Sequence, residues 1–134
     1  EFVRYGVMHQ NTFLQSPKLL DKYYADRRNP LVAFAGQMTG VEGYVESTAS
    51  GYLAAVAMAA KGQGREGPNF PKETAIGALG QYVSDESIEN FQPMNINFSI
   101  IAPLEKRIRK KAEKNLAIAA RSLDVIDRLV AKGI

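Results

Sequence analysis

The strongest pattern of apolar and polar positions lies at the carboxyl end of the chain. After Pro103, apolar residues recur at steps of three or four, the spacing of one helix face: Leu104, Ile108, Ala112, Leu116, Ala119, Leu123, Ile126 and Val130. Proline suits the first position of a helix, where an N–H would have no intrahelical partner. The pattern predicts an amphipathic helix over residues 103–134, docked on its own domain or paired with a partner helix as a coiled coil.

A second pattern, in the first half, places a buried strand before a helix of small residues. Residues 31–35 are apolar without alternation, which is typical of a strand buried on both faces of a parallel sheet. A glycine-containing loop follows over residues 36–40, and residues 41–61, rich in Ala, Gly and Ser, predict a helix. Gly43 and Gly51 each cost about 1 kcal/mol of helix propensity, so we expect a packing reason for both.

The other segments are shorter. Residues 2–15 partly alternate and predict a strand with a polar turn. Residues 62–72 are a loop rich in Gly and Pro, residues 73–83 predict a short helix, and residues 84–102 look irregular. The fold class is therefore α/β and predominantly helical.

The amino-acid composition limits the kinds of functional site that this chain can form. The 134 residues are 46% hydrophobic and 23% charged, which fits one globular domain or a piece of one. The absence of cysteine excludes disulfides, thiolate metal sites and cysteine nucleophiles within this chain. With His9 as the one histidine, we predict neither a metal site nor a conventional Ser-His-Asp triad. The longest apolar run, residues 52–60, is too short for a bilayer, and no leader is visible, so we expect a cytoplasmic protein without membrane contact.

Charge is concentrated in the last quarter. Residues 1–103 carry eight basic and ten acidic residues, whereas residues 104–134 carry nine basic and four acidic ones. We predict that Arg107, Lys110, Lys111 and Lys114 bind RNA phosphates, the alternative being a solvated helix face. Because no aromatic residue follows Phe98, this helix is not expected to offer a platform for base stacking.

Two glycine-containing segments differ in context. Residues 62–67 read G-x-G-x-x-G but follow a predicted helix and precede Pro68, so they lack the strand-to-helix setting of a dinucleotide fingerprint. Residues 36–51 have that setting, with an aromatic at Tyr44 and a carboxylate at Glu46. Backbone N–H groups at the positive helix end favour a phosphate or a reduced flavin, and the alternative is a glycine loop kept for tight packing.

Several blocks in order carry a family resemblance. They are Arg4-Tyr5-Gly6-Val7-Met8-His9 with Asn11-Thr12, Ser16-Pro17-Lys18-Leu19-Leu20, Phe34-Ala35-Gly36-Gln37 through Glu46, and Asn90-Phe91-Gln92-Pro93-Met94-Asn95. The Gly36–Gly51 segment resembles the second flavin-contacting motif of the glucose-inhibited division protein A superfamily. The whole chain resembles the carboxy-terminal third of the folate- and FAD-dependent tRNA (uracil-5-)-methyltransferases.

The resemblance implies a function and a set of site residues. Such enzymes take a one-carbon unit from methylenetetrahydrofolate, reduce it with NAD(P)H through FAD, and methylate the T-loop uridine of tRNA. By resemblance, the residues lining the flavin are Gly36, Gln37, Gly40, Gly43 and Tyr44. His9 would lie at the flavin and folate pocket, and Tyr44 would also touch folate. The fold implied is the last strand and helix of an FAD-binding Rossmann-like domain followed by helices.

Two family features are missing here, the amino-terminal glycine fingerprint and the cysteines near the uridine. We therefore expect a fragment without catalytic residues of its own, not competent alone and possibly binding no cofactor, with tRNA through its T-arm and the rest of the FAD domain as partners. Its expected parts are residues 1–62, the end of the FAD-binding domain; 63–102, a loop-rich connection; and 103–134, the basic helix.

Three alternatives stay open at this point. The chain could derive from the wobble-uridine tRNA-modifying paralogues of the same superfamily, which share the Gly-Gln and Gly-Tyr parts of the second flavin motif. It could instead be a non-catalytic RNA-binding or assembly module that keeps the flavin motif as scaffold. An exposed Ala-rich face on the helix at residues 41–61 could also drive self-association.

Overall fold

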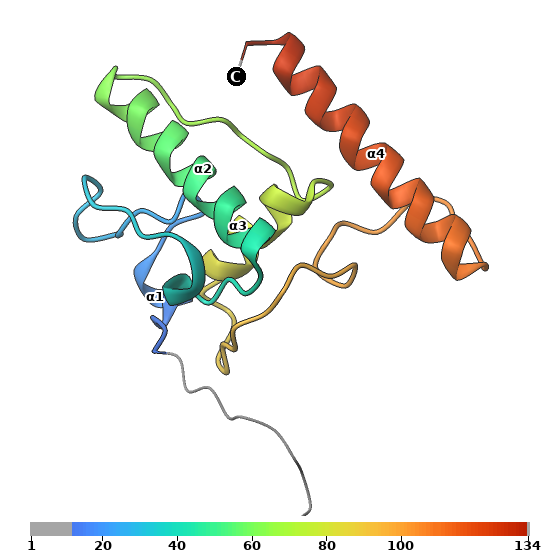
Figure 1. Ribbon diagram of the computed structural model, residues 1–134, viewed down its shortest axis with the longest axis horizontal. Helices are drawn as coiled ribbons and strands as arrows, with labels where there is room; N and C mark the ends of the chain where they lie inside the picture. The colour runs from blue at the N-terminus through green and yellow to red at the C-terminus, as the bar shows by residue number, and fades with distance from the viewer. Residues whose placement is uncertain (1–11, 134) are drawn as a thin grey trace, which may run out of the picture.

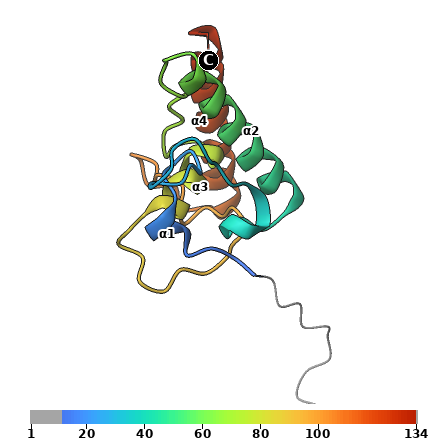
Figure 2. The same cartoon turned by 90° about the vertical axis from the view of Figure 1, so that its left-hand side faces the viewer.

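Helices provide nearly all of the regular structure. The structure is a computed structural model and describes residues 12–133. Its elements are α1 (Ser16–Leu19), the short 3₁₀ helix η1 (Gly36–Thr39), α2 (Tyr44–Gly62), α3 (Ala75–Ser84) and α4 (Lys111–Ala131). In Figures 1 and 2, α1 lies at one end of the molecule and the carboxyl end of α4 at the other. No helix among residues 12–133 combines the length and hydrophobicity that a bilayer crossing requires.

The prediction of a doubly buried strand at residues 31–35 is wrong for the structure described. Ala33 makes one isolated antiparallel bridge with Ala25, and Leu31 is 76% exposed. A parallel strand needs hydrogen-bonding neighbours along its edges. Residues 12–133 supply only isolated bridges, so this apolar run lies on the surface. The strand predicted over residues 2–15 falls mostly outside the described residues.

The predicted helix of small residues is confirmed as α2, which begins three residues later than expected. Gly43 lies outside the helix as its N-cap, with φ 95°, a backbone conformation that side chains disfavour. The carboxyl end is a Schellman motif, in which Arg65 N–H donates to Ala60 O and Gly64, with φ 68°, donates to Lys61 O. The G-x-G-x-x-G segment is therefore the stop signal of a helix.

The short helix predicted at residues 73–83 is confirmed as α3. Thr74 is its N-cap, and the buried hydroxyl accepts a hydrogen bond from Gly77 N–H at 3.1 Å. A Cβ at Gly77 would overlap the carbonyl oxygens of Phe70 and Pro71, and one at Gly80 would lie 2.6 Å from Lys22 O. These glycines let α3 pack directly on neighbouring backbone.

The main core lies between α2, α3 and the loop after α3. Its buried members include Tyr24, Leu53, Phe70, Leu79 and Phe91. The Phe91 ring packs 5.4 Å from that of Tyr82 and 6.2 Å from that of Phe13, measured between ring centroids. Figure 1 shows this unit, with α2 and α3 side by side, and the long connection over residues 85–110 that leads from it to α4.

The final helix begins at Lys111, eight residues after the predicted start at Pro103. Residues 103–110 are not helical, and Lys110 has an extended backbone. The apolar spacing therefore predicts the helix but not its first residue, and Lys110, Lys111 and Lys114 lie at its positive end, where cations are disfavoured.

The predicted apolar stripe of this helix does not form its docking face. Leu116, Leu123 and Val130 are 71%, 63% and 61% exposed, and Ile118 is the one buried residue of α4. Arg121, on the docked side, donates to the carbonyl oxygens of Ala102 and Pro103. The helix is therefore held by the buried Ile118, by the half-buried Leu129, which packs against the main core, and by Arg121, while Leu116, Leu123 and Val130 face outward.

Candidate functional site

The segment predicted to contact flavin forms one continuous turn-and-helix unit. Gly36, with φ 70°, starts η1, and its N–H donates to the buried Ser50 hydroxyl of α2 at 2.8 Å. Gly40 ends η1 in the left-handed conformation. The predicted residues Gly36, Gln37, Gly40, Gly43 and Tyr44 are thus brought together before and at the start of α2.

The Asn90–Asn95 block, about fifty residues further along, packs directly on this unit. Val41 and Met94 form a parallel bridge, with Glu42 N–H donating to Met94 O and Met94 N–H to Gly40 O, both at 3.0 Å. A Cβ at Gly40 would overlap the Phe91 ring. Two of the blocks that carry the family resemblance are therefore parts of one local structure.

Tight packing explains two of the predicted glycines. A Cβ at Gly43 would collide with the Glu46 carboxylate and lie 2.7 Å from Asn95 Nδ2. Glu46 in turn accepts a hydrogen bond from Ile96 N–H at 3.3 Å. The Phe91 ring therefore leaves no room for a side chain at Gly40, whereas at Gly43 the φ of 95° disfavours one and the Glu46 and Asn95 side chains would have to shift. The Glu46 carboxylate is used inside the protein.

The start of α2 nevertheless presents groups that suit a cofactor. Tyr44 is 95% exposed, and Gln37 is exposed beside it. Among residues 12–133, no acceptor is found for the backbone N–H groups of Tyr44 and Val45. Free N–H groups at the positive end of a 19-residue helix attract an anionic or electron-rich group. The N–H donors of Tyr44 and Val45 fit a flavin or a phosphate on this open surface. His9, which was predicted to lie at the same pocket, falls outside the described residues.

The predicted RNA-binding residues cluster at the other long helix. An open hollow of about 680 Å³ lies at the start of α4. We call it the basic hollow, and it is lined chiefly by Phe98, Arg107, Arg109, Lys111, Lys114 and Asn115. Three of the four predicted residues line it, whereas Lys110 pairs with Glu113 at 3.0 Å. Phe98, Arg109 and Asn115 were not among the predicted RNA-binding residues. Phe98 lies in the preceding connection, and only the fold brings it to the helix.

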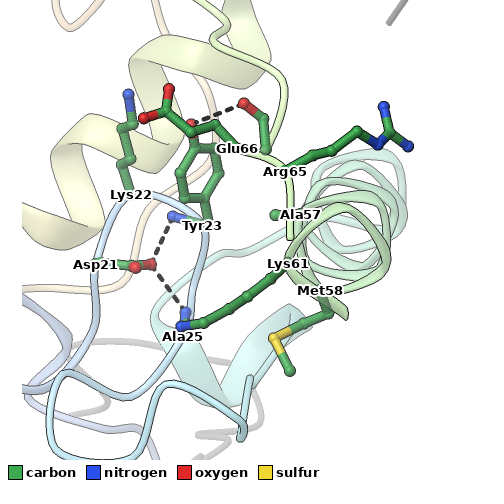
Figure 3. Close-up of a pocket in the computed structure, with 10 residues that line it drawn as sticks. Asp21, Lys22, Tyr23, Ala25, Ala57, Met58, Lys61, Arg65 and Glu66 are labelled. Carbon is green, nitrogen blue, oxygen red and sulfur yellow. Dashed lines mark hydrogen bonds between the residues drawn. The ribbon is translucent and has the colours of Figure 1, made fainter. Parts of the chain in front are cut away.

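A further cavity of about 430 Å³ lies at the carboxyl end of α2, away from the flavin segment (Figure 3). Tyr23 forms one wall, with its hydroxyl donating to Gly67 O at 3.2 Å and the Lys22 ammonium 5.0 Å from its ring centroid. Asp21 accepts hydrogen bonds from Tyr23 N–H and Ala25 N–H. These contacts account for Asp21 and the Tyr23 hydroxyl as parts of the local turn structure.

Comparisons with known proteins give one family-model match and several relatives that share one name. Residues 1–66 match the family model described as glucose inhibited division protein A. The chain is 53% identical over 132 residues to the methylenetetrahydrofolate–tRNA-(uracil-5-)-methyltransferase TrmFO of Acetivibrio thermocellus, and 52% identical over 132 residues to that of Natranaerobius thermophilus. The Bacillus cereus protein of the same name is 53% identical over 130 residues.

These matches cover almost all of this chain but a minor part of each relative. The alignments span 97–98% of the chain and 30% of the relatives' own length. The similarity to the glucose inhibited division protein A family model lies in residues 1–66. The chain spans about a third of the length of the curated relatives it matches.

Proposed function

We propose that this chain is the carboxy-terminal part of a methylenetetrahydrofolate-dependent tRNA (uracil-5-)-methyltransferase of the glucose-inhibited division protein A family. The observation that carries the proposal is identity of 52–53% to enzymes of that name across nearly the whole chain. The family-model match ends at residue 66, while the similarity to these relatives continues to the other end of the chain. That order supports a position at the carboxyl side of the family's common region.

In this proposal the amino-terminal half completes an FAD site. FAD, when bound, supplies the reducing equivalents for the one-carbon transfer. The free N–H groups of Tyr44 and Val45 would donate to it, and the exposed Tyr44 ring would cover one side. Gly40 and Gly43 would act by shaping the turn, since their missing side chains make room for Phe91, Glu46 and Asn95.

His9 and Tyr44 are proposed to contact the folate co-substrate. Both residue types offer flat rings that can stack on a pterin. The exposed position of Tyr44 at the start of α2 leaves its ring free for such a contact. The reduction of the one-carbon unit by NAD(P)H and its delivery to the T-loop uridine would use residues of the remaining two thirds of the protein.

The basic helix is proposed to hold the T-arm of tRNA. Arg107, Lys111 and Lys114 line one open hollow, and none of them forms an ion pair within residues 12–133. Free cations grouped in this way attract phosphates and release counterions on binding. Lys110 is predicted to contribute less, because Glu113 already neutralises it.

The first experiment tests the cofactor surface in the intact protein. Tyr44→Ser should weaken FAD binding, measured by flavin fluorescence, and lower methylation of tRNA with labelled methylenetetrahydrofolate about tenfold or more. Tyr52→Ser, an exposed tyrosine two turns further along α2, is the matched control and should leave both unchanged. Equal behaviour of the two variants would contradict the assignment of Tyr44.

The position of the modified nucleotide separates the proposed function from its rivals. Label from methylenetetrahydrofolate should appear at C5 of the T-loop uridine. Modification of the wobble uridine instead would assign the chain to the paralogous branch of the superfamily. Tight tRNA binding without flavin or label transfer would favour a non-catalytic RNA-binding module.

A further inference from the structure

The basic hollow contains an aromatic ring that the sequence places outside the basic segment. Phe98 precedes Arg107 by nine residues and α4 by thirteen, yet it lines the same hollow as Lys111 and Lys114. It is 46% exposed, so one side of the ring remains open to a ligand. α4 itself carries no aromatic residue, as the sequence shows, but the preceding connection brings the Phe98 ring to the same hollow.

We propose that the basic hollow binds one unstacked nucleotide of RNA, with its phosphates held by the cations and its base stacked on Phe98. The proposal rests on the proposed function only for the identity of the partner as RNA. It goes further because it assigns a base contact where the basic residues alone indicate contact with the backbone. It also assigns a role to Phe98 and Asn115.

The charges of the hollow favour a polyanion. Arg107, Arg109, Lys111 and Lys114 line it without a carboxylate, and none of the four is ion-paired within residues 12–133. Four cations close together repel one another, and those at the start of α4 also face the positive end of the helix dipole. This repulsion between the cations adds nothing to folding stability, and bound phosphates would relieve it.

The surroundings of Phe98 favour a base over a simple anion. Phe98 also lines an adjoining apolar groove of about 520 Å³, whose other walls include Ile96, Ile101, Ile118 and Leu123. The ring thus joins an apolar surface to a cationic one. A nucleotide has the same two parts, a flat base that stacks on aromatic rings and a charged phosphate.

Asn115 supplies the polar group that a base edge requires. Its side chain lines the hollow and is half-buried, and no hydrogen bond from its amide is found among residues 12–133. A carboxamide offers both a donor and an acceptor to a base edge. The hollow therefore contains stacking, hydrogen-bonding and phosphate-binding groups within one nucleotide-sized volume.

The test compares RNA with a polyanion that has no bases. In the intact protein, Phe98→Leu should weaken binding of an unmodified tRNA transcript about tenfold, because stacking contributes roughly 1–3 kcal/mol per base. Binding of inorganic polyphosphate should not change. Phe98→Trp should restore tRNA affinity, and Tyr52→Leu, an exposed aromatic on α2, should leave it unchanged.

Salt dependence separates the phosphate contacts from the base contact. Lys111→Gln and Lys114→Gln should each lower the slope of log affinity against log salt by about 0.7–0.9, whereas Phe98→Leu should lower affinity without changing the slope. Lys132→Gln, at the far end of the same helix, is the matched control.

The outcomes distinguish this inference from the proposed function. Loss of tRNA affinity in both lysine variants with full affinity in Phe98→Leu would overturn base stacking and leave backbone contact intact. Full affinity in all three variants would overturn the hollow as an RNA site and leave its apolar groove to a protein segment. The methylation assay on the wild-type protein reports on the proposed function independently of either result.

Discussion

The two long helices have similar lengths but are used in opposite ways. α2 has 19 residues and buries five of them, all but Leu53 being Ala or Ser. α4 has 21 residues, carries the more regular apolar stripe, and buries only Ile118. Small side chains allow a helix backbone to approach its neighbours closely, whereas a regular stripe is buried only where a partner surface exists. Regular spacing therefore predicts a helix more reliably than it predicts which face is covered.

The largest expected effect comes from overfilling the α2–α3 unit. Gly77→Val should destabilise the chain by about 3 kcal/mol or more, because the new side chain meets two backbone carbonyls that cannot move independently. Gly51→Ala is the contrasting change, since its Cβ would have only Ala35 Cβ nearby, at 3.9 Å. We expect it to stabilise α2 by about 0.5–1 kcal/mol. Urea unfolding measures both, and a neutral Gly77→Val would contradict the close packing.

The second prediction concerns Ile118, the one fully buried side chain of α4. Ile118→Ala should cost about 2–4 kcal/mol locally and loosen the packing of the helix, since it leaves a cavity beneath α4 and only the half-buried Leu129 still packs on the main core. Leu123→Ala, on the exposed stripe, should change stability by less than about 0.5 kcal/mol. Hydrogen exchange should show faster exchange of α4 amides in Ile118→Ala with α3 unchanged. Loss of protection in both helices would mean that α4 belongs to the central cooperative unit.

The third prediction moves self-association from α2 to α4. Of the alanines of α2, Ala54, Ala57 and Ala60 are buried, whereas Ala55 and Ala59 are exposed. α4 carries a regular stripe of larger exposed apolar residues, Leu116, Leu123 and Val130, spaced by seven residues. Replacing all three with Gln should weaken self-association of the isolated chain about tenfold or more, measured by sedimentation.

Val45→Gln provides the matched control for that stripe. Val45 is an exposed apolar residue on the first turn of α2, so its replacement removes similar surface from the other helix. We expect it to leave the association unchanged. Association that falls with Val45→Gln and persists without the α4 stripe would return the contact to the α2 region.

Features encoded by neighbouring residues could be predicted from the sequence, and features that depend on distant segments could not. Thr74 caps α3 through a hydroxyl three residues from its partner, so its local pattern was sufficient. Residues 31–35 predicted a strand because they are apolar, but pairing requires strands that residues 12–133 do not contain. The apolar spacing predicts α4 but not its first residue, since Leu104 and Ile108 continue the spacing through residues that are not helical.

The same distinction applies to the candidate site. Gly36, Gln37, Gly40, Gly43 and Tyr44 adjoin one another in sequence, so one motif located them all. The contact of Phe91 and Asn95 with the two later glycines joins segments about fifty residues apart. Phe98 was assigned to an irregular stretch, and only the path of residues 99–110 brings it to the basic helix. The flavin role of the residues from Gly36 to Tyr44 and the RNA role of Phe98 stay predictions.

The smallest predicted effect is a difference in how pH changes the free energy of unfolding through the buried Tyr24 and through the exposed Tyr44. Burial in the α2–α3 unit raises the pKa of the Tyr24 hydroxyl above its ordinary value of 10.0, because the charged phenolate is poorly solvated there. The folded state prefers the neutral Tyr24 hydroxyl, and this preference makes its full contribution to the free energy of unfolding below pH 10. The contribution is lost as the pH rises above 10 toward the folded-state pKa. Tyr24→Phe should flatten the decline of unfolding free energy above pH 10, whereas Tyr44→Phe, on the exposed start of α2, should leave it unchanged. Urea unfolding between pH 9 and about 11 makes the comparison, since lysine and arginine titrate alike in the two variants. Parallel curves for Tyr24→Phe and wild type would show that the core opens before its tyrosine ionises, and α2 would then be no better protected from solvent than α4.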